Sequence, residues 1–489
     1  MRELYATTYD SRGYSDENML LNYGLIEPAV LSRNLTYLWG KDSDMFPLTT
    51  LSEGQGAFKS LKPITLNDTQ YTWNTMGRMK HTSRVVSLVV SNEDEPGLGR
   101  TPIEVIMEDN WFIKSYTAFS PDGKSQVRIQ SEGTKVGANR YKYIFELQGG
   151  NEDDFIDPDN FTEGKAWVMG APTIAASKSD GSRSNSMAPG KLTNQFGLHR
   201  YSKEITGNIA NKITVIEFDL EDGSKTNMWM PFEMKLFELD RRLYNESDLW
   251  LSEYNRDDRG VIHLKDPDTG EPIPRGAGVF QTLKSFGHYD TYSKLTYGKL
   301  NNTVNAVFDN RVDSTPTEIV LHTGKGGARE FHNAIMSDAT ARQYFTPLGE
   351  KEISGGIYLT YGAYFNQYRT IDNKLITVKT SNYFDHGLMA EAQRANGDMI
   401  DGLPRDSYTM VFLDQSRTDD GDRNIQLVAE EGREHITGIY KGITPLPGSW
   451  GAVSDKLIST RRDVASYEVI DTAGIAFKNP TTSFLLERQ

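Results

Sequence analysis

The sequence predicts an α+β protein in which helices concentrate in the middle of the chain and strands lie on both sides of them. Two observations carry this prediction. The first is a long helical pattern over Thr226–Asn255, in which apolar side chains recur at heptad spacing. The second is a succession of short runs of β-branched and aromatic residues, separated by Pro and Gly turn signals, before and after that helix.

The predicted helix is a spine around which other elements are expected to pack. Its apolar lines cover an arc of roughly 160°, wider than the stripe of an ordinary surface helix, so the arc should be covered on two sides. Pro231 fits in the first turn, where its missing N–H would be unpaired anyway. Glu238 and Arg242 are expected to pair on the polar side. The two main heptad lines are Trp229, Leu236, Leu243, Trp250 and Met230, Phe237, Tyr244, Leu251. The predicted spine-helix core is Trp229, Phe232, Leu236, Leu239, Leu243 and Trp250.

The part of the chain before the spine helix is predicted to be an arm followed by strands. Residues 1–80 are polar and aromatic with weak periodicities, which favours an extended arm with one or two short helices. From Arg84 the pattern changes to strands, and turn signals beside them predict long hairpins. These predicted strands are Val85–Val90, Ile103–Ile106, Trp111–Tyr116, Gln126–Ile129, Tyr141–Leu147 and Ile213–Phe218.

Residues 171–195 interrupt this pattern. They are rich in Ser, Gly and other small residues and hold almost no large apolar side chain. Such a stretch cannot fold on its own contacts. Two interpretations stay open: a flexible surface loop, or a segment that only a partner orders.

After the spine helix the chain returns gradually to strands. A short helix is expected within 261–286, and a further helix carries Leu295, Leu300, Val304, Val307 and Phe308. The strand Thr317–His322 runs into TGKGGAR and then into an amphipathic helix with Phe331, Ile335 and Met336. The predicted strands of the C-terminal third are Leu375–Lys379, Tyr408–Leu413, Ile425–Val428, Ile436–Tyr440 and Tyr467–Ile470.

The strand–TGKGGAR–helix unit invites comparison with a phosphate-binding loop. A Walker loop requires G-x-x-x-x-G-K-S/T, in which the hydroxyl binds magnesium. In this sequence Gly326 follows Lys325, no hydroxyl follows, and no earlier Gly lies at the required spacing. The sequence therefore favours a tight turn in which Gly supplies a positive φ. The candidate turn residues are Gly324, Lys325, Gly326 and Gly327.

No catalytic or metal-binding constellation stands out. His322 and His332 are ten residues apart and lack a ligand spacing, so ordinary core or surface histidines are expected. The acidic clusters at 151–160 and 418–424 lack the spacing of a calcium loop and are expected to be solvated turns. No nucleophile elbow occurs, and no carboxylate pair is singled out among the 67 Asp and Glu. The prediction is a non-enzyme without catalytic residues, cofactor or metal.

Composition limits the possible partners and compartment. The chain has 489 residues, 37% of them hydrophobic, and no Cys, so it is globular without a disulfide scaffold. No apolar run predicts a signal peptide or a membrane span, which favours a protein made and kept in a cytoplasm. A net charge of −14 argues against sequence-independent binding of nucleic acid but suits a protein that lies near it.

Several blocks of the sequence resemble one family. The run WMPFEMKLFELDRRLYNESDLWLSEYNRDDRGVIHLKDPDTGEPIPRGAGVFQTL (229–283) is similar to the spine-helix region of major capsid proteins from crAss-like and related tailed bacteriophages. Other parts of that family are similar to blocks 317–335, 405–428 and 196–218. The resemblance lies in the order of these blocks and in their residue patterns, over roughly residues 80–440. The resemblance implies the Hong Kong 97-type capsid fold.

Carried onto this chain, the resemblance implies five regions. Residues 1–80 would be the N-terminal arm, and 81–215 a β-rich region with the extended loop and room for an inserted domain. Residues 216–300 would be the peripheral domain with the spine helix, 301–440 the axial domain, and 441–489 a C-terminal return to the core. The candidate turn at Gly324–Gly327 would then lie in the axial domain, near the contacts that close each capsomer.

The implied function is self-assembly into the icosahedral shell around the double-stranded DNA genome of a tailed phage. The implied partners are further copies of the chain in hexameric and pentameric capsomers, portal and auxiliary or decoration proteins, and packaged DNA nearby without sequence-specific contact. No membrane is involved, and the shell would be assembled in the bacterial host cytoplasm. The alternatives are a carbohydrate-active enzyme or another virion component, such as a tail or portal protein.

Overall fold

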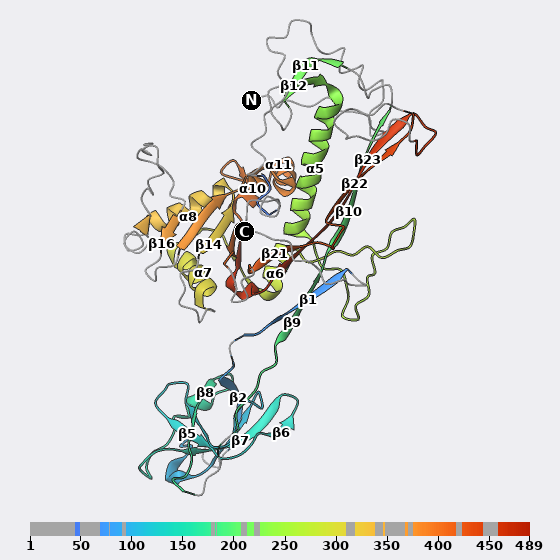
Figure 1. The fold of residues 1–489 in the computed structure, drawn as a ribbon. Coiled ribbons are helices and arrows are strands. Elements are labelled where there is room, and N and C mark those ends of the chain that lie inside the picture. Colours follow the sequence, from blue (N-terminus) through green and yellow to red (C-terminus); the bar gives the residue numbers. More distant parts are fainter. Residues whose placement is uncertain are drawn as a thin grey trace. The chain divides into compact units, whose positions relative to one another are not determined.

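The computed structural model divides the chain into two compact units, residues 74–191 and the remainder. The boundaries fall inside β1 (Gln70–Thr75) and β9 (Gly190–Gln195), which pair with each other (Figure 1). The predicted arm over 1–80 lies mostly outside the described residues. Those are 45–48, 69–77, 79–89, 94–177, 181, 183–206, 213–219, 225–309, 318–337, 346–347, 367–369, 375–416, 423–443 and 458–489.

The unit 74–191 is a small antiparallel barrel. Strand β3 pairs with both β2 and β7, so the strand order β3-β2-β8-β4-β5-β7 closes on itself, and β6 continues beside β7. Closure leaves the six barrel strands without a free edge. The strands are β2 (Thr82–Val89), β3 (Ile103–Met107), β4 (Tyr116–Phe119), β5 (Gln126–Ile129), β6 (Thr134–Gly137), β7 (Arg140–Leu147) and β8 (Ala166–Pro172).

Alternating side chains fill the inside of this barrel. In β3 the buried residues are Ile103, Val105 and Met107, as the two-residue period of a strand requires. Phe145 and Trp167 add aromatic bulk at a ring separation of 5.5 Å. Two 3-10 turns complete the unit, η1 (Leu98–Arg100) and η2 (Pro158–Phe161). The barrel therefore has a hydrophobic core of its own.

The predicted strand Trp111–Tyr116 is wrong, because the strand begins only at Tyr116. Phe112 and Ile113 are consecutive and both buried, which a two-residue period does not allow. Ser115 has a φ of 73°, in the left-handed region, and its N–H donates to Ile129 O at 2.8 Å. The segment before Tyr116 is thus a buried corner of the barrel.

The second unit is built on a mixed seven-stranded sheet in the order β13-β24-β20-β14-β17-β16-β15. Strands β14 and β17 are parallel, as are β13 and β24, while β20 is antiparallel to both its neighbours. The strands are β13 (His288–Tyr292), β14 (Glu318–Thr323), β15 (Thr346–Pro347), β16 (Gln367–Arg369), β17 (Leu375–Thr380), β20 (Met410–Asp414) and β24 (Phe484–Arg488).

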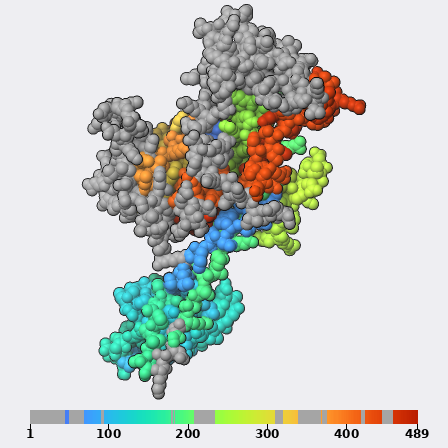
Figure 2. All heavy atoms as spheres, in the orientation of Figure 1, coloured from blue at the N-terminus to red at the C-terminus, as the bar shows by residue number. Residues whose placement is uncertain are grey.

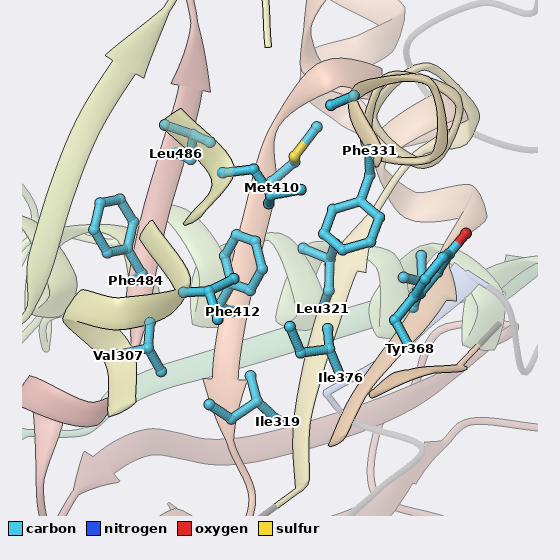
Figure 3. Close-up of a cluster of buried hydrophobic side chains, with 14 of the residues drawn as sticks. Val307, Ile319, Leu321, Phe331, Tyr368, Ile376, Met410, Phe412, Phe484 and Leu486 are labelled. Atoms are coloured by element: carbon cyan, nitrogen blue, oxygen red, sulfur yellow. The ribbon is translucent and has the colours of Figure 1, made fainter. Parts of the chain in front are cut away.

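Helices cover both faces of this sheet. On one face α7 (Tyr297–Asp309) and α8 (Lys325–Ser337) pack over Phe412, Leu321 and their neighbours (Figure 3). On the other face α5 (Trp229–Leu251), α6 (Val279–Phe286) and α10 (Asn382–His386) form a second core with the opposite side chains of the strands. Burial on both faces explains why β20 is apolar from Met410 to Leu413.

A second sheet of the same unit is centred on the long strand β23 (Val464–Phe477). Strand β10 (Gly197–Thr206) pairs along one side of it, and β22 (His435–Lys441) and β21 (Ile425–Val428) follow each other along the other side. Helix α5 runs beside β10 and β23 (Figure 1). This helix contacts the second sheet from Phe237 to Asp248, and it contacts the main sheet at its C-terminal end.

Smaller elements complete the unit. They are the hairpins β11 (Ile213–Asp219) with β12 (Lys225–Met228) and β18 (Met399–Ile400) with β19 (Leu403–Pro404), helix α11 (Leu388–Asn396), and the 3-10 turns η3 (Arg405–Tyr408) and η5 (Pro480–Thr482). Among the described residues, no helix combines the length and hydropathy that crossing a bilayer requires.

The connection between α5 and α6 is an irregular arm, drawn in yellow-green, that stands out from the surface (Figure 2). Single bridges join Arg256 to Ile262 and Lys265 to Pro272. At its base the buried amide of Gln195 donates to Asn255 Oδ1 at 2.7 Å. The arm is thus held by polar contacts at its base.

Candidate functional site

The α5 face that meets β23 is polar. Arg241 Nη1 lies 2.5 Å from Asp471 Oδ2, and Arg241 Nε lies 2.8 Å from Glu238 Oε2. The same Asp471 carboxylate accepts from Asn245 Nδ2 at 2.8 Å and lies 2.7 Å from His435 Nδ1. The Arg241 and Asp471 side chains are only 9% and 6% exposed. Helix and sheet are therefore joined by a buried, hydrogen-bonded ion pair.

The pKa values of two carboxyl groups are lowered where α5 meets the second sheet. Burial by itself opposes the charge of Asp471, but the bond to His435 and the charge of Arg241 outweigh it and lower its pKa. In the same way His199 and Arg275 outweigh burial and lower the pKa of Asp248. A carboxyl whose pKa is lower in the folded state stabilises the fold above its unfolded value of about 4 and loses that contribution as the pH falls further.

The C-terminal end of α5 is anchored by a tryptophan. Trp250 is fully buried, with its ring stacked at 6.1 Å on Tyr383 and edge-on at 5.3 Å to Phe384. Its indole N–H donates to Glu246 Oε1 at 2.8 Å, and the same oxygen accepts from the backbone N–H of Leu48 at 2.8 Å. A single buried carboxylate thus connects the helix to the short segment 45–48.

The predicted core of the spine helix has a mixed environment. Trp250 is buried, while Leu236, Leu239 and Leu243 are half-buried. The side chains of Trp229 and Phe232 lie outside what the structure describes.

The predicted apolar arc is too wide, and the predicted Glu238–Arg242 pair is replaced. Tyr244, in the middle of the arc, is 49% exposed. Arg241 and Asn245 take the inner position instead, and Glu238 pairs with Arg241 one residue earlier. Arg241 and Asn245 are four residues apart, hence on one helix face, but their partner Asp471 is far away in sequence.

The glycine run at Gly324–Gly327 is not a positive-φ turn. Helix α8 begins at Lys325, so Gly326 and Gly327 form its first turn, and neither has a positive φ. The Lys325 N–H lies 3.2 and 3.3 Å from the two Asp385 carboxylate oxygens, and the Gly326 N–H donates to Ser407 Oγ at 2.8 Å. An internal carboxylate therefore takes the place that an anion occupies at a helix N-terminus.

Close packing, not backbone freedom, explains these glycines. A Cβ on Gly326 would lie 2.8–2.9 Å from the buried ring of Tyr408. One on Gly324 would lie 2.7 Å from Ser407, and one on Gly327 would collide with the hydroxyl of Thr323. The glycine run in the sequence indicates that small residues are required here. The sequence does not indicate why, because η3, which supplies Ser407 and Tyr408, comes some eighty residues later.

Replacing Gly326 by alanine is expected to destabilise the chain by about 1–3 kcal/mol, the usual effect of overpacking. Gly298, in the first turn of α7, has nothing within 4 Å of the position that a Cβ would take. Gly298→Ala should therefore be neutral or stabilise by about 0.5–1 kcal/mol. Urea denaturation of both variants measures the difference, and equal effects would contradict the packing explanation.

His322 is a core residue. It is fully buried, its Nε2 lies 3.1 Å from Gln415 Nε2, and its ring is 6.3 Å from that of Trp250. Burial, with a smaller effect of Lys379, lowers its pKa to about 3. His332 bonds instead to Tyr368 on the α8 side, Nδ1 to Oη at 3.0 Å. No group of three His, Asp or Glu side chains that could hold a metal occurs among the residues described.

This burial predicts a pH dependence. A histidine in the unfolded chain titrates near 6.5. Between pH 6.5 and about 3, His322 is therefore protonated in the unfolded state and neutral in the folded state. His322 should therefore reduce stability progressively as the pH falls from 6.5. His322→Gln should flatten the fall measured by denaturation between pH 6.5 and 4.5, whereas His81→Gln, at an exposed side chain, should leave it unchanged. The same slope in all three proteins would contradict the assignment.

Comparisons with known proteins bear on the whole chain. The profile of the family described as "Crassvirus major capsid protein" matches residues 6–489. A comparison with curated protein sequences finds no match. Solved structures with likeness include Microbacterium phage Oxtober96 (10% identity, covering 97% of this chain and 99% of that one, TM-score 0.35). Another is Mycobacterium phage Bobi (8% identity, covering 97% of this chain and 99% of that one, TM-score 0.35). A third is the "Capsid of empty GTA particle computed with C5 symmetry" (7% identity, covering 96% of this chain and 97% of that one, TM-score 0.35).

Proposed function

The chain belongs to the Crassvirus major capsid protein family, and from this membership we propose how its parts contribute to a phage shell. The protein is a major capsid protein with the Hong Kong 97-type fold, as the sequence resemblance implies, and it forms the capsid shell. The match over residues 6–489 carries this conclusion, because it spans both compact units. This match favours a role in the capsid shell over the alternatives of a tail protein, a portal protein or a carbohydrate-active enzyme.

We assign the regions of the fold as follows. The pair β1 and β9 is the stem of the extended loop, and the barrel 74–191 is a domain inserted into it. Its closed sheet and separate core support that assignment. Helix α5 with β10, β22 and β23 is the peripheral domain, and the seven-stranded sheet with α7 and α8 is the axial domain. The C-terminal strand β24 returns to that sheet, between β13 and β20.

The finer features of assembly are also proposals. Copies of the chain would form hexameric and pentameric capsomers of an icosahedral shell in the bacterial host cytoplasm, together with portal and auxiliary or decoration proteins. Double-stranded DNA would lie inside without sequence-specific contact, which the net charge of −14 supports because a shell must release its genome. The chain would act structurally, without catalysis.

Electron microscopy of the expressed protein tests this function. We expect closed shells or capsomers, and sizing should give megadalton particles. A single small species at every concentration would contradict shell formation, while rings or tubes alone would favour a portal or tail role.

Residues 171–195 provide a further prediction about assembly. Between β8 and β9 the described residues are mostly exposed. They make polar contacts, among them the bond from Tyr116 Oη to Arg183 O at 3.1 Å, that from Asn185 Nδ2 to Trp111 O at 2.6 Å and the ion pair of Arg183 with Glu132 at 2.6 Å. Ordering costs roughly 1–2 kcal/mol per residue, which so little burial cannot offset. Neighbouring subunits could supply the missing contacts.

Hydrogen exchange on both forms measures this. The predicted loop extends too far at both ends, because 171–172 close β8 and 190–195 form β9, which pairs with β1. Residues 173–189 should exchange rapidly and be cleaved by proteases in the unassembled subunit, and they should be protected in the shell. The amides of β3 serve as the control, since they should be protected in both forms. Fast exchange of 173–189 before and after assembly would leave only the interpretation of a solvated loop.

A further inference from the structure

The barrel unit has a hollow on its surface that shell formation does not explain. It has a volume of about 600 Å³ and lies where the start of β5 and the end of β7 meet the loop 149–156. Phe155, 48% exposed, forms part of its wall. Leu147 also lines it, and most of the other lining side chains are polar, among them Gln126, Gln148 and Asp153.

The loop that carries Phe155 is fixed to the barrel. The Gly99 N–H donates to Glu152 O and the Ile156 N–H to Pro96 O, both at 2.9 Å. The side chain of Ile156, next to Phe155, is fully buried in the barrel core. The aromatic ring is thus held at the surface by its neighbours, so little ordering would be required when a ligand binds.

Some polar groups of the hollow have partners inside the barrel: Asp154 accepts from the Asn151 N–H at 3.2 Å, and Lys124 lies 4.0 Å from Asp122. Elsewhere in the unit such groups satisfy one another, as Arg128 does with Gln130 and Ser115. By contrast, the side chains of Gln126, Gln148 and Asp153 make no hydrogen bond within the described part of the barrel. Their donors and acceptors are therefore available to a ligand.

The charges of the hollow select the class of ligand. Asp153 and Asp154 disfavour phosphate and other anions, and Lys124 on the same wall offsets part of their attraction for a cation. Two carboxylates also fall short of the six to eight oxygens that calcium takes. What fits is an uncharged molecule with one apolar face and many hydroxyls. We propose that this hollow binds a neutral saccharide, with a sugar ring against Phe155 and its hydroxyls on the glutamine amides and Asp153.

Saturation-transfer NMR on the full-length chain tests this, with neutral trisaccharides of glucose, galactose and N-acetylglucosamine as probes. We expect transfer to the ring C–H protons of at least one probe and a more than tenfold weaker affinity in Phe155→Ala. Gln148→Ala should weaken binding as well. The matched control is Tyr440→Ala, which removes an equally exposed aromatic ring (49%) from the other unit and should change nothing.

The remaining outcomes would overturn the proposal. They are no transfer to any of the three probes, equal binding by wild type and Phe155→Ala, or binding of calcium or spermidine with none of saccharide. Circular dichroism of each variant establishes that its fold is intact. The shell assay is independent of this result, because the saccharide site does not rest on capsid assembly.

Discussion

Replacing Trp250 by alanine is expected to destabilise the chain by about 3–5 kcal/mol, the range of Trp truncation in cores. The indole is fully buried against Tyr383 and Phe384, and it links α5 to the main sheet. The change would also remove the indole N–H that Glu246 accepts, leaving a buried carboxylate with fewer partners. Urea denaturation of the unassembled subunit gives the free energy of unfolding.

Tyr244→Ala is the control on the same helix, because Tyr244 is 49% exposed. It should change the free energy of unfolding by no more than about 0.5 kcal/mol. If Trp250→Ala were as mild as this control, the C-terminal end of α5 could not be the anchor between helix and sheet. Shell formation by Trp250→Ala should fail in parallel with its loss of stability.

Breaking the ion pair under α5 should have an effect of similar size. Asp471→Ala leaves the Arg241 guanidinium buried without its main partner, which typically costs about 3–5 kcal/mol. Removing both charges, as in Arg241→Met with Asp471→Leu, should lower the free energy of unfolding much less. The reason is that apolar groups can replace a buried ion pair with little loss of stability. A double-mutant cycle therefore should show a large coupling between the two positions.

The opposite face of the same strands offers a matched control. Arg200 and Glu468 pair there at 3.2 Å, with side chains 71% and 25% exposed. An exposed pair of this kind contributes about 0–1 kcal/mol, so Glu468→Ala should be mild. Equal effects of Asp471→Ala and Glu468→Ala would show that burial of the first pair does not matter.

The sequence predicts the elements of this fold better than their contacts. Apolar periodicity locates α5, α7 and α8 and most strands with long apolar runs, such as β7 and β20. It misses β10, whose exposed positions are Leu198, Arg200, Ser202 and Glu204, because the strand forms by pairing with the distant β23. Short helices such as α10 are missed for a similar reason, since their length gives no periodicity.

The buried polar contacts could not be predicted from the sequence. A buried Arg241 looks like any helix-surface arginine until Asp471 is placed beside it. The glycines of α8 predict a turn because turns are the commonest reason for such a run. Their actual reason, the approach of Tyr408 and Ser407, arises from a segment that the chain brings back much later. Predictions from local pattern fail where distant segments meet.

The pairing of β1 with β9 makes the barrel replaceable. Because the two strands are hydrogen-bonded neighbours, the chain leaves for the barrel and returns from it about 4.8 Å apart. A two-residue turn can bridge that gap, so the barrel could be excised and another compact domain grafted in its place, provided that its own termini lie close together. The capsid protein would then accept a different domain at this position while the residues that build the seven-stranded sheet and the sheet around β23 stay unchanged.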